Sequence, residues 1–380
     1  MFRLTHFVRE LRSPTPAGPR RPPPGPVVIW NLVRRCNLSC RHCYSASTDK
    51  DFSGELSTDE VFATLADLKA AGVPALILSG GEPLLRPDLF AIAAEAKRLG
   101  FHLSLSTNGT LIDEDLADRI AAARFDYVGI SIDGLPGLHD HFRGKDGAHS
   151  AALAGIRRCR RRDLNVGLRF TVTQDNAPQL DDLLALMRAE GVGKFYLSHL
   201  NYAGRGNRNK GEDAGMALAR STMDRLFEAA LADVEAGGGH EFVTGNNDAD
   251  GPYFLGWVRR RFPDRAEHIR AKLHQWGGNA SGMNVANIDN LGWVHPDTMW
   301  WHERLGNVRE RAFGDIWRDT SNPLMAALKT HPRTLGGRCA GCRHLAICNG
   351  NSRVRAERVH GDRWAEDPGC YLTDEEISCA

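Results

Sequence analysis

Short apolar runs alternate with longer amphipathic segments from residue 27 onward. Six runs have the length and composition of strands: 27–33, 75–79, 102–106, 127–132, 166–172 and 194–200. The segments between them have helical periodicity, which favours parallel strands joined by right-handed crossovers. The pattern predicts an α/β fold, a partial (βα)6 TIM-like barrel over residues 27–240, with its ligand site at the C-terminal ends of the strands.

The first helix has clear signals at both ends. Ser57 precedes Glu60 by three residues, which is a capping box, and Gly72 follows the periodic segment. We therefore expect a helix between these positions.

The strand-helix rhythm is lost after Leu200, and a different C-terminal unit is predicted over residues 241–380. A long helix is expected at about 213–235, an Arg-rich amphipathic segment at 257–273 and a hairpin at 283–296 that turns at Asn290–Gly292. At the other end, the proline run in residues 13–26 excludes a helix. Residues 1–26 are predicted to be a disordered, Pro-rich leader outside the core.

Composition narrows the class of protein. The 380 residues are 42% hydrophobic and 25% charged, with a net charge of +1, so no overall field recruits nucleic acid or an anionic membrane. No apolar stretch approaches the ~20 residues needed to span a bilayer, and "MFRLTHFVRELR" lacks the apolar core of a signal peptide. A cytoplasmic protein without nucleic-acid or membrane partners is expected.

Nine cysteines in a reducing compartment indicate metal or redox chemistry, and seven of them fall in two groups. The first group, Cys36, Cys40 and Cys43, follows the first strand directly. A zinc ion requires a fourth ligand, and His42 cannot easily fold back between its neighbours. Thiolates also suit iron-sulfur clusters, where three ligands leave one iron open for chemistry.

Small polar groups end the next strands. "SGGEPLL" (79–85) has adjacent glycines that let a ligand approach the backbone, and Glu82 offers an acceptor for an ammonium group. "STNGT" (106–110) and "SIDG" (131–134) place hydroxyl, amide and carboxylate groups on the same face.

C-x3-C-x2-C followed by an aromatic residue, together with GGEP after the second strand, resembles the radical S-adenosylmethionine (SAM) superfamily. The resemblance implies that Cys36, Cys40 and Cys43 hold a [4Fe-4S] cluster whose free iron chelates SAM, and that cleavage of SAM yields the 5′-deoxyadenosyl radical. It also implies a set of SAM contacts: Tyr44, Gly80, Gly81, Glu82, Ser106, Asn108, Ser131 and Arg143. Tyr44 is expected near the adenine, and Ser131 and Arg143 near the carboxylate.

The second group is Cys339, Cys342, Cys348 and Cys370. A zinc ribbon is one interpretation. The spacing of these four cysteines instead resembles the SPASM/twitch extension of radical SAM enzymes. A full SPASM domain has three further cysteines that hold another cluster. In this chain the corresponding positions are Gly278, Asp297 and Ser352. The resemblance implies one auxiliary [4Fe-4S] cluster with four protein ligands, hence two clusters in all, and a role in electron relay. Cys159 and Cys379 receive no role.

The whole chain from about Val27 resembles the radical SAM enzymes of haem d1 biosynthesis. This implies removal of propionate side chains from a sirohaem-derived tetrapyrrole, 12,18-didecarboxysirohaem, with electrons from a reductase with flavodoxin or ferredoxin. Maturation of a ribosomal peptide, another sirohaem-derived haem pathway reaction, and a non-catalytic zinc or iron-sulfur module are the alternatives; a peptide maturase is expected to have a larger N-terminal recognition domain. Candidate substrate contacts are His199, Tyr202, Arg205, Arg208 and His302. No general acid or base is assigned.

Overall fold

Ten strands form one sheet within residues 1–16 and 25–378, which are those that the computed structural model describes. The strand order is β10-β9-β8-β1-β2-β3-β4-β5-β6-β7, and β1 to β7 are all parallel. The strands are β1 (Val27–Asn31), β2 (Ala75–Ser79), β3 (His102–Thr107), β4 (Tyr127–Ser131), β5 (Val166–Val172), β6 (Lys194–His199), β7 (Glu241–Gly245), β8 (Val285–Ile288), β9 (Trp293–His295) and β10 (Gly306–Asn307). The six predicted strands are confirmed, two of them to the residue, and the structure is a partial barrel of the predicted class.

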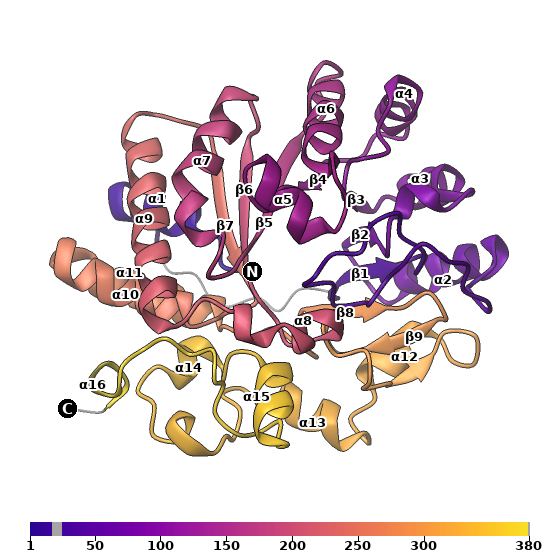
Figure 1. Cartoon of the computed structure of the whole chain (residues 1–380). Helices are drawn as coiled ribbons and strands as arrows, with labels where there is room; N and C mark the ends of the chain where they lie inside the picture. The colour runs from indigo at the N-terminus through magenta and orange to yellow at the C-terminus, as the bar shows by residue number, and fades with distance from the viewer. Residues whose placement is uncertain (17–24, 379–380) are drawn as a thin grey trace.

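Helices cover the outside of the curved sheet (Figure 1). The α-helices of the barrel are α2 (Thr58–Ala70), α3 (Leu89–Arg98), α4 (Glu114–Ala122), α5 (Pro136–Arg143), α6 (Ala148–Arg160), α7 (Leu180–Ala189), α8 (Gly204–Arg208) and α9 (Met216–Glu235). Short 3-10 helices lie at η1 (Pro83–Leu85), η2 (Ala177–Gln179), η3 (Lys210–Glu212), η4 (Pro263–Arg265) and η5 (Gly337–Cys339). The capping box of Ser57 and Glu60 at the start of α2 is present as predicted.

The sheet does not divide at the predicted boundary near residue 240. β7, which the sequence did not reveal, pairs in parallel with β6, and β8 pairs in parallel with β1. The hairpin of β8 and β9 is confirmed, with Gly292 at φ +85° in its turn. Strands from both predicted units therefore build one continuous sheet, because β8 to β10 satisfy the hydrogen bonds of the edge that β1 would otherwise expose.

The prediction of a disordered leader over residues 1–26 is wrong for its first part. α1 (Leu4–Arg12) packs against α9 and β7, and Phe2 exchanges two backbone hydrogen bonds of 2.8 Å with Thr244. Leu4, Phe7 and Leu11 are buried because their spacing gives α1 one apolar face. The helix ends at Arg12, before the first proline, so the proline run does not prevent it; residues 17–24 lie outside the described part of the chain.

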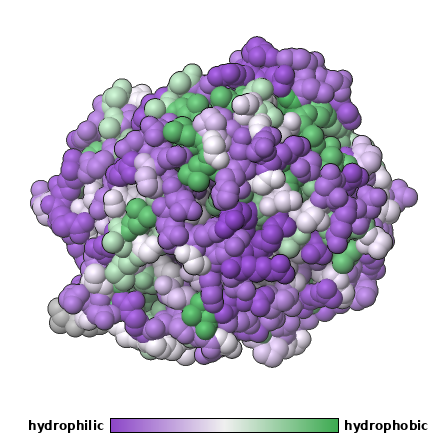
Figure 2. All heavy atoms as spheres, viewed as in Figure 1, coloured by the Kyte–Doolittle hydropathy of each residue, from purple (hydrophilic) through white to green (hydrophobic). Residues whose placement is uncertain are grey.

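The C-terminal segment, orange to yellow in Figure 1, lies along one side of the barrel next to α8. Its helices are α10 (Asp250–Arg261), α11 (Ala266–Trp276), α12 (Phe313–Arg318), α13 (Pro323–Lys329), α14 (Leu345–Cys348), α15 (Arg353–His360) and α16 (Asp374–Ile377). The predicted Arg-rich segment 257–273 is divided between α10 and α11. Among the described residues, no helix is long and apolar enough to cross a membrane. Figure 2 shows polar side chains over most of the face in that view.

Candidate functional site

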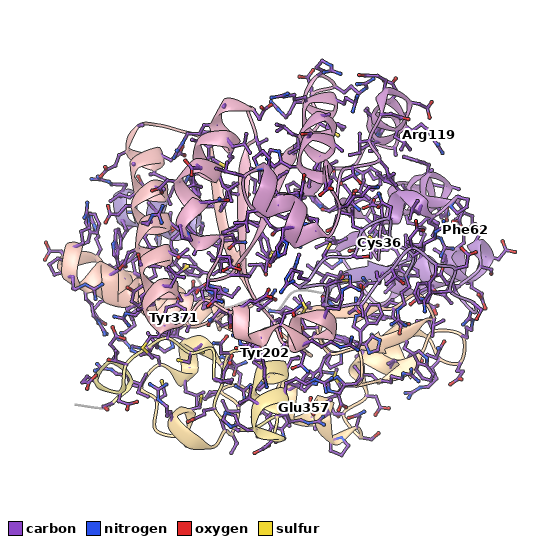
Figure 3. The ribbon with its side chains drawn as sticks, in the orientation of Figure 1. Cys36, Phe62, Arg119, Tyr202, Glu357 and Tyr371 are labelled. Atoms are coloured by element: carbon purple, nitrogen blue, oxygen red, sulfur yellow. The ribbon has the colours of Figure 1, made fainter. Side chains whose placement is uncertain are left out.

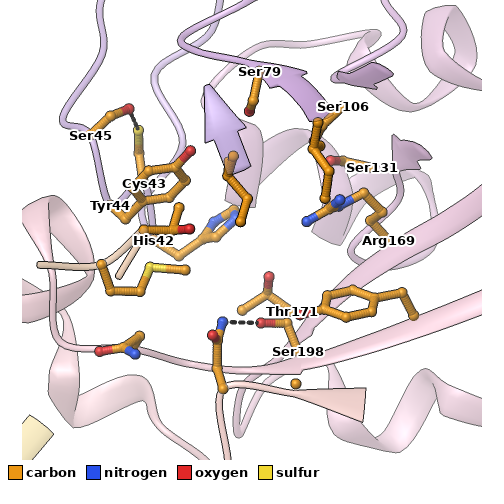
Figure 4. A pocket seen from close by; sticks show the side chains of 18 of the residues that line it. His42, Cys43, Tyr44, Ser45, Ser79, Ser106, Ser131, Arg169, Thr171 and Ser198 are labelled. Carbon is orange, nitrogen blue, oxygen red and sulfur yellow. Dashed lines mark hydrogen bonds between the residues drawn. The ribbon is translucent and has the colours of Figure 1, made fainter. Parts of the chain in front are cut away.

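Small polar side chains ring a cavity at the C-terminal ends of the parallel strands. Ser79, Ser106, Ser131, Thr171 and Ser198 come from five neighbouring strands, β2 to β6, and all line the cavity (Figure 4). The alternation of side chains along a strand places these residues on the inner face of the barrel. The cavity has a volume of about 320 Å³, so it is large enough for a ligand of metabolite size.

The first cysteine group lies in the loop after β1, and all three thiols line this cavity. Cys36 and Cys40 are buried and Cys43 is half-buried. The loop is held from outside: Arg205 donates from Nε to the Cys40 carbonyl at 2.6 Å and from Nη1 to the Ser47 carbonyl at 2.8 Å. Backbone hydrogen bonds add to this, including Cys36 N–H to the Thr48 carbonyl at 3.0 Å. These hydrogen bonds fix the loop that carries the three thiols, of which Cys36 is labelled in Figure 3.

The cysteines are not arranged around a single ion. A zinc ion holds thiolates at about 2.3 Å, so sulfur atoms on one zinc are at most about 4.6 Å apart. Among the described residues, only His302, Glu303 and Glu357 bring three possible ligand atoms within 4.8 Å of one another. A polynuclear cluster binds each thiolate at a separate iron, so its thiolates need not approach one another this closely.

Polar groups surround the three thiols. Arg143 Nη1 lies 3.5 Å from Cys40 Sγ, and its Nη2 donates to buried Asp133. Asn108 Nδ2 lies 3.9 Å from Cys36 Sγ, while the Ser45 hydroxyl is 3.3 Å from Cys43 Sγ. Burial raises the pKa of Cys36 to about 12, so this thiol keeps its proton until a metal displaces it. The buried Nε of Arg143 and Nδ1 of His42 have no hydrogen-bond partner within the described chain.

Two glycines let the loop after β2 lie directly on the loop after β1. Gly80 has φ +153°, and a Cβ there would lie 3.1 Å from Val33 Cγ1. A Cβ on Gly81 would lie 2.5 Å from the Arg34 carbonyl oxygen and closer still to that of Arg35. The Gly81 N–H donates to the Val33 carbonyl at 2.6 Å. Only glycine fits at both positions, because the two loops share a backbone contact.

Glu82 is not among the residues that line the cavity, and its contact with an ammonium group stays a prediction. Its carboxylate is buried and accepts from Thr107 Oγ1 at 2.7 Å and from the Asn108 N–H at 2.8 Å. It also accepts from the Leu84 N–H at 3.2 Å. Burial raises the pKa of Glu82 to about 7, although these hydrogen bonds act to lower it. Glu82 joins the loops that follow β2 and β3 and so positions Asn108.

The other predicted SAM contacts line the cavity: Tyr44, Gly80, Gly81, Ser106, Asn108, Ser131 and Arg143. The Tyr44 hydroxyl accepts from Asn31 Nδ2 at 2.7 Å, which fixes the ring at the cavity wall.

The candidate substrate contacts are mostly not brought to the cavity. His199 lines it, with Nε2 3.0 Å from Asp250 Oδ1, and Arg205 lines it while bound to the cysteine loop. Tyr202 instead donates to Asp213 Oδ2 at 2.9 Å. Arg208 is exposed, and exposed His302 pairs with Glu357 at 2.7 Å.

Sequence reasoning missed several cavity residues. Arg169 and Tyr196 lie on inner faces of β5 and β6, and Asn246 and Asp248 follow the unrecognised strand β7. Period-two alternation within 166–172 and 194–200 would have placed the first two on one face.

The second cysteine group comes together in the C-terminal segment. Burial raises the pKa of Cys348, and the nearby Cys370, Asp248, Cys339 and Cys342 raise it further. Asp367, which is next to this group, forms a fully buried ion pair with Arg355 at 2.9 Å. Arg355 also donates to the carbonyls of Leu200 and Asn246, which follow β6 and β7. The cysteine site is thereby attached to the rim of the cavity.

The three positions without cysteine have other uses. A Cβ on Gly278 would collide with the Cys348 carbonyl group, and Asp297 accepts from the Ser281 hydroxyl at 2.5 Å. Ser352 caps α15. Buried Arg333 donates to Asn279 Oδ1 and to the Ser281 carbonyl, each at 2.7 Å, and occupies the space beside them. Cys159 is buried in the core on α6, and Cys379 lies outside the described residues.

A barrel with three loop cysteines, a glycine cradle and a polar ring at its strand ends defines the class of protein, and sequence comparison agrees. Residues 30–187 match the family model of the radical SAM superfamily. The chain belongs to this superfamily, whose members use a [4Fe-4S] cluster and SAM.

Two curated relatives are similar over almost their whole length. A pre-heme d1 synthase of Dinoroseobacter shibae is 55% identical, with 100% of this chain and 94% of the relative covered. An Fe-coproporphyrin III synthase of Methanosarcina barkeri is 42% identical, with 93% and 89% covered. Among solved structures, Streptococcus suis SuiB bound to S-adenosylmethionine has a TM-score of 0.73 at 16% identity, covering 97% of this chain and 81% of that one. At this identity the likeness concerns the fold alone.

Proposed function

We propose that this chain is a radical SAM enzyme of haem d1 biosynthesis that removes propionate side chains from 12,18-didecarboxysirohaem. The observation that carries the proposal is the 55% identity with a pre-heme d1 synthase over the full length of this chain. A second relative, at 42% identity, is named for another iron porphyrin. A PqqA peptide cyclase of Gluconobacter oxydans is only 29% identical, so a peptide substrate is not favoured.

Cys36, Cys40 and Cys43 would hold the cluster at the cavity wall, because their sulfur atoms line it and are too widely spaced for one ion. When bound, the cluster and SAM together supply the 5′-deoxyadenosyl radical. Arg143 keeps a cation 3.5 Å from Cys40 Sγ, where it offsets the charge of a thiolate-bound cluster. The backbone at Gly80 and Gly81 gives a ligand close approach, and Ser131 and Tyr44 offer hydroxyl groups at the strand ends.

The loop contact at Gly81 leads to a prediction for SAM binding. Gly81→Ala should raise the SAM dissociation constant roughly tenfold or more, because relieving an overpacked contact costs about 1–3 kcal/mol and tenfold corresponds to about 1.4 kcal/mol. Isothermal titration of the anaerobically reconstituted protein measures it. Gly193→Ala is the matched control, since no atom lies within 4 Å of the added Cβ. Equal SAM affinity in both variants would contradict the proposed role of this loop.

A second [4Fe-4S] cluster bound by Cys339, Cys342, Cys348 and Cys370 completes the proposal. Four thiolates leave no open iron, which suits electron relay. Glycine, aspartate and serine at 278, 297 and 352, with Arg333 packed among their neighbours, support a single auxiliary cluster. A reductase with flavodoxin or ferredoxin is the proposed electron donor.

The auxiliary site can be tested by iron counting. Cys348→Ser combined with Cys370→Ser should lower the reconstituted iron content from about eight to about four per chain, while 5′-deoxyadenosine formation without tetrapyrrole continues. A wild-type content of about four irons, unchanged in this variant, would eliminate the auxiliary cluster. Zinc in place of the lost iron would indicate a zinc ribbon.

The reaction itself is tested with the reconstituted protein, SAM, a reductant and 12,18-didecarboxysirohaem under anaerobic conditions. Mass spectrometry should show products smaller by one and then two propionate side chains, with 5′-deoxyadenosine formed alongside. Deoxyadenosine without any change in tetrapyrrole mass would refute the proposed substrate and leave the superfamily assignment intact.

A further inference from the structure

Three large side chains lie on the inner face of the sheet, and each lies over a glycine of a neighbouring strand. Tyr127 of β4 covers Gly167 of β5, where a Cβ would lie 2.7 Å from its Cζ. Tyr196 of β6 covers Gly245 of β7, with the corresponding distance 2.9 Å. The third is Arg169 of β5, which lies over Gly129 of β4.

The stem of Arg169 depends on that glycine. A Cβ on Gly129 would lie 2.8 Å from Arg169 Cδ and 3.1 Å from Tyr127 Cε1. The guanidinium carbon lies 5.0 Å from the centre of the Tyr196 ring. Figure 4 shows the side chain extending into the cavity near Ser106 and Ser131. The base of the barrel thus supports a cation and directs it toward the ligand space.

Arg169 is the guanidinium that the rest of the site leaves available. Arg143, Arg169 and Arg205 line the cavity. Of these, Arg143 is bound to Asp133, and Arg205 donates to two backbone carbonyls of the cysteine loop. Within the described chain, the Arg169 side chain has neither a hydrogen bond nor a carboxylate within 4.0 Å, and its guanidinium lies over the Tyr196 ring.

The two carboxylates that line the cavity form hydrogen bonds with other side chains and not with Arg169. Asp248 accepts from Asn279 Nδ2 at 3.0 Å, and Asp297 accepts from Ser281 Oγ. In a partly desolvated site, a guanidinium binds most strongly to an anion that can accept two parallel hydrogen bonds from it, and a carboxylate is such an anion.

We propose that Arg169 binds a propionate carboxylate of the tetrapyrrole substrate and thereby fixes which side chain faces the radical. The inference rests on the proposed function. SAM also has a carboxylate that could bind Arg169. However, Arg143 is the guanidinium beside Cys40, whereas Arg169 contacts none of the three thiols, so the substrate carboxylate is the better match for Arg169. Arg169 is thus a specificity residue for the substrate.

The test uses Arg169→Gln and Arg169→Lys in the reconstituted holoprotein, with Arg188→Gln as the matched control. Arg188 is exposed on α7 and has no ion pair or side-chain hydrogen bond in the described chain. Absorbance titration measures binding of 12,18-didecarboxysirohaem and of its propionate methyl esters, and isothermal titration measures SAM. Iron content confirms that each variant is folded and loaded.

Arg169→Gln should weaken binding of the free acid about 10- to 100-fold, because a charged hydrogen bond contributes about 1.5–3 kcal/mol. Its affinity for the methyl esters and for SAM should stay near wild type, and Arg169→Lys should fall between. A purely structural role would weaken acid and ester alike. If Arg169→Gln still binds the free acid more tightly than the methyl esters to the same extent as wild type, the inference is overturned. If only the affinity for SAM falls, the guanidinium binds SAM and not the substrate. If the wild-type protein binds neither form, the proposed function fails instead.

Discussion

Replacing Cys36, Cys40 and Cys43 together with alanine is expected to remove about four irons per chain and to abolish 5′-deoxyadenosine formation. The three thiols are the cluster ligands that the cavity wall offers, and the polar side chains nearest to them, Ser45, Asn108 and Arg143, supply no thiolate in their place. Iron and sulfide counting after anaerobic reconstitution gives the first result, and chromatographic detection of deoxyadenosine under reductant gives the second.

Cys159→Ala is the control for this variant. Cys159 is fully buried on α6, packs in the apolar core and does not line the cavity. Its loss should leave the iron content and deoxyadenosine formation unchanged, apart from a modest cost in stability. Iron content at the wild-type level in the triple variant would mean that the cluster is held elsewhere.

Arg355→Met is expected to destabilise the protein by about 3–5 kcal/mol, because it leaves Asp367 as an uncompensated buried charge. Both side chains of this pair are 0% exposed, and the nitrogen–oxygen distance is 2.9 Å. The substitution also removes the hydrogen bonds to the carbonyls of Leu200 and Asn246. The loss should appear as a lower midpoint in anaerobic guanidinium chloride unfolding of the reconstituted protein.

The double variant Arg355→Met, Asp367→Asn should recover part of this loss, since no buried charge then lacks a partner. Arg188→Met makes the same change at an exposed site and should alter the free energy of unfolding by less than about 0.5 kcal/mol. A similarly small effect of Arg355→Met would show that water reaches Asp367 and that the C-terminal segment is attached to the barrel by other contacts.

The elements that the sequence predicted well are those set by local chemistry. The six strands are apolar runs bounded by turn residues, and the start of α2 is set by Ser57 and Glu60 three residues apart. Gly80 and Gly81 were recognised as a place of close backbone approach, and the structure adds that the approaching backbone is that of residues 33–35.

The sequence did not reveal the hydrogen-bond partners of the polar side chains. Arg205 and Tyr202 lie in a loop that reaches the site, yet one binds the cysteine loop and the other binds Asp213. Glu82 has the right chemistry for an ammonium group but satisfies Thr107 and the Asn108 N–H. Periodicity does not show which hydrogen bonds a polar side chain finds, since those partners are chosen when separate loops pack together.

By itself the sequence determined the parallel barrel, the position of its ligand site and the two cysteine groups, because strand length, turn residues and thiol spacing are local properties. Only the tertiary structure decided that α1 belongs to the core, that β8 closes against β1, and that Arg169 enters the cavity without a carboxylate partner. The first two depend on which faces meet across more than 100 residues: α1 contacts α9 and β7, and Val27 pairs with Val285. Such contacts follow from burying complementary surfaces together, which no single segment specifies.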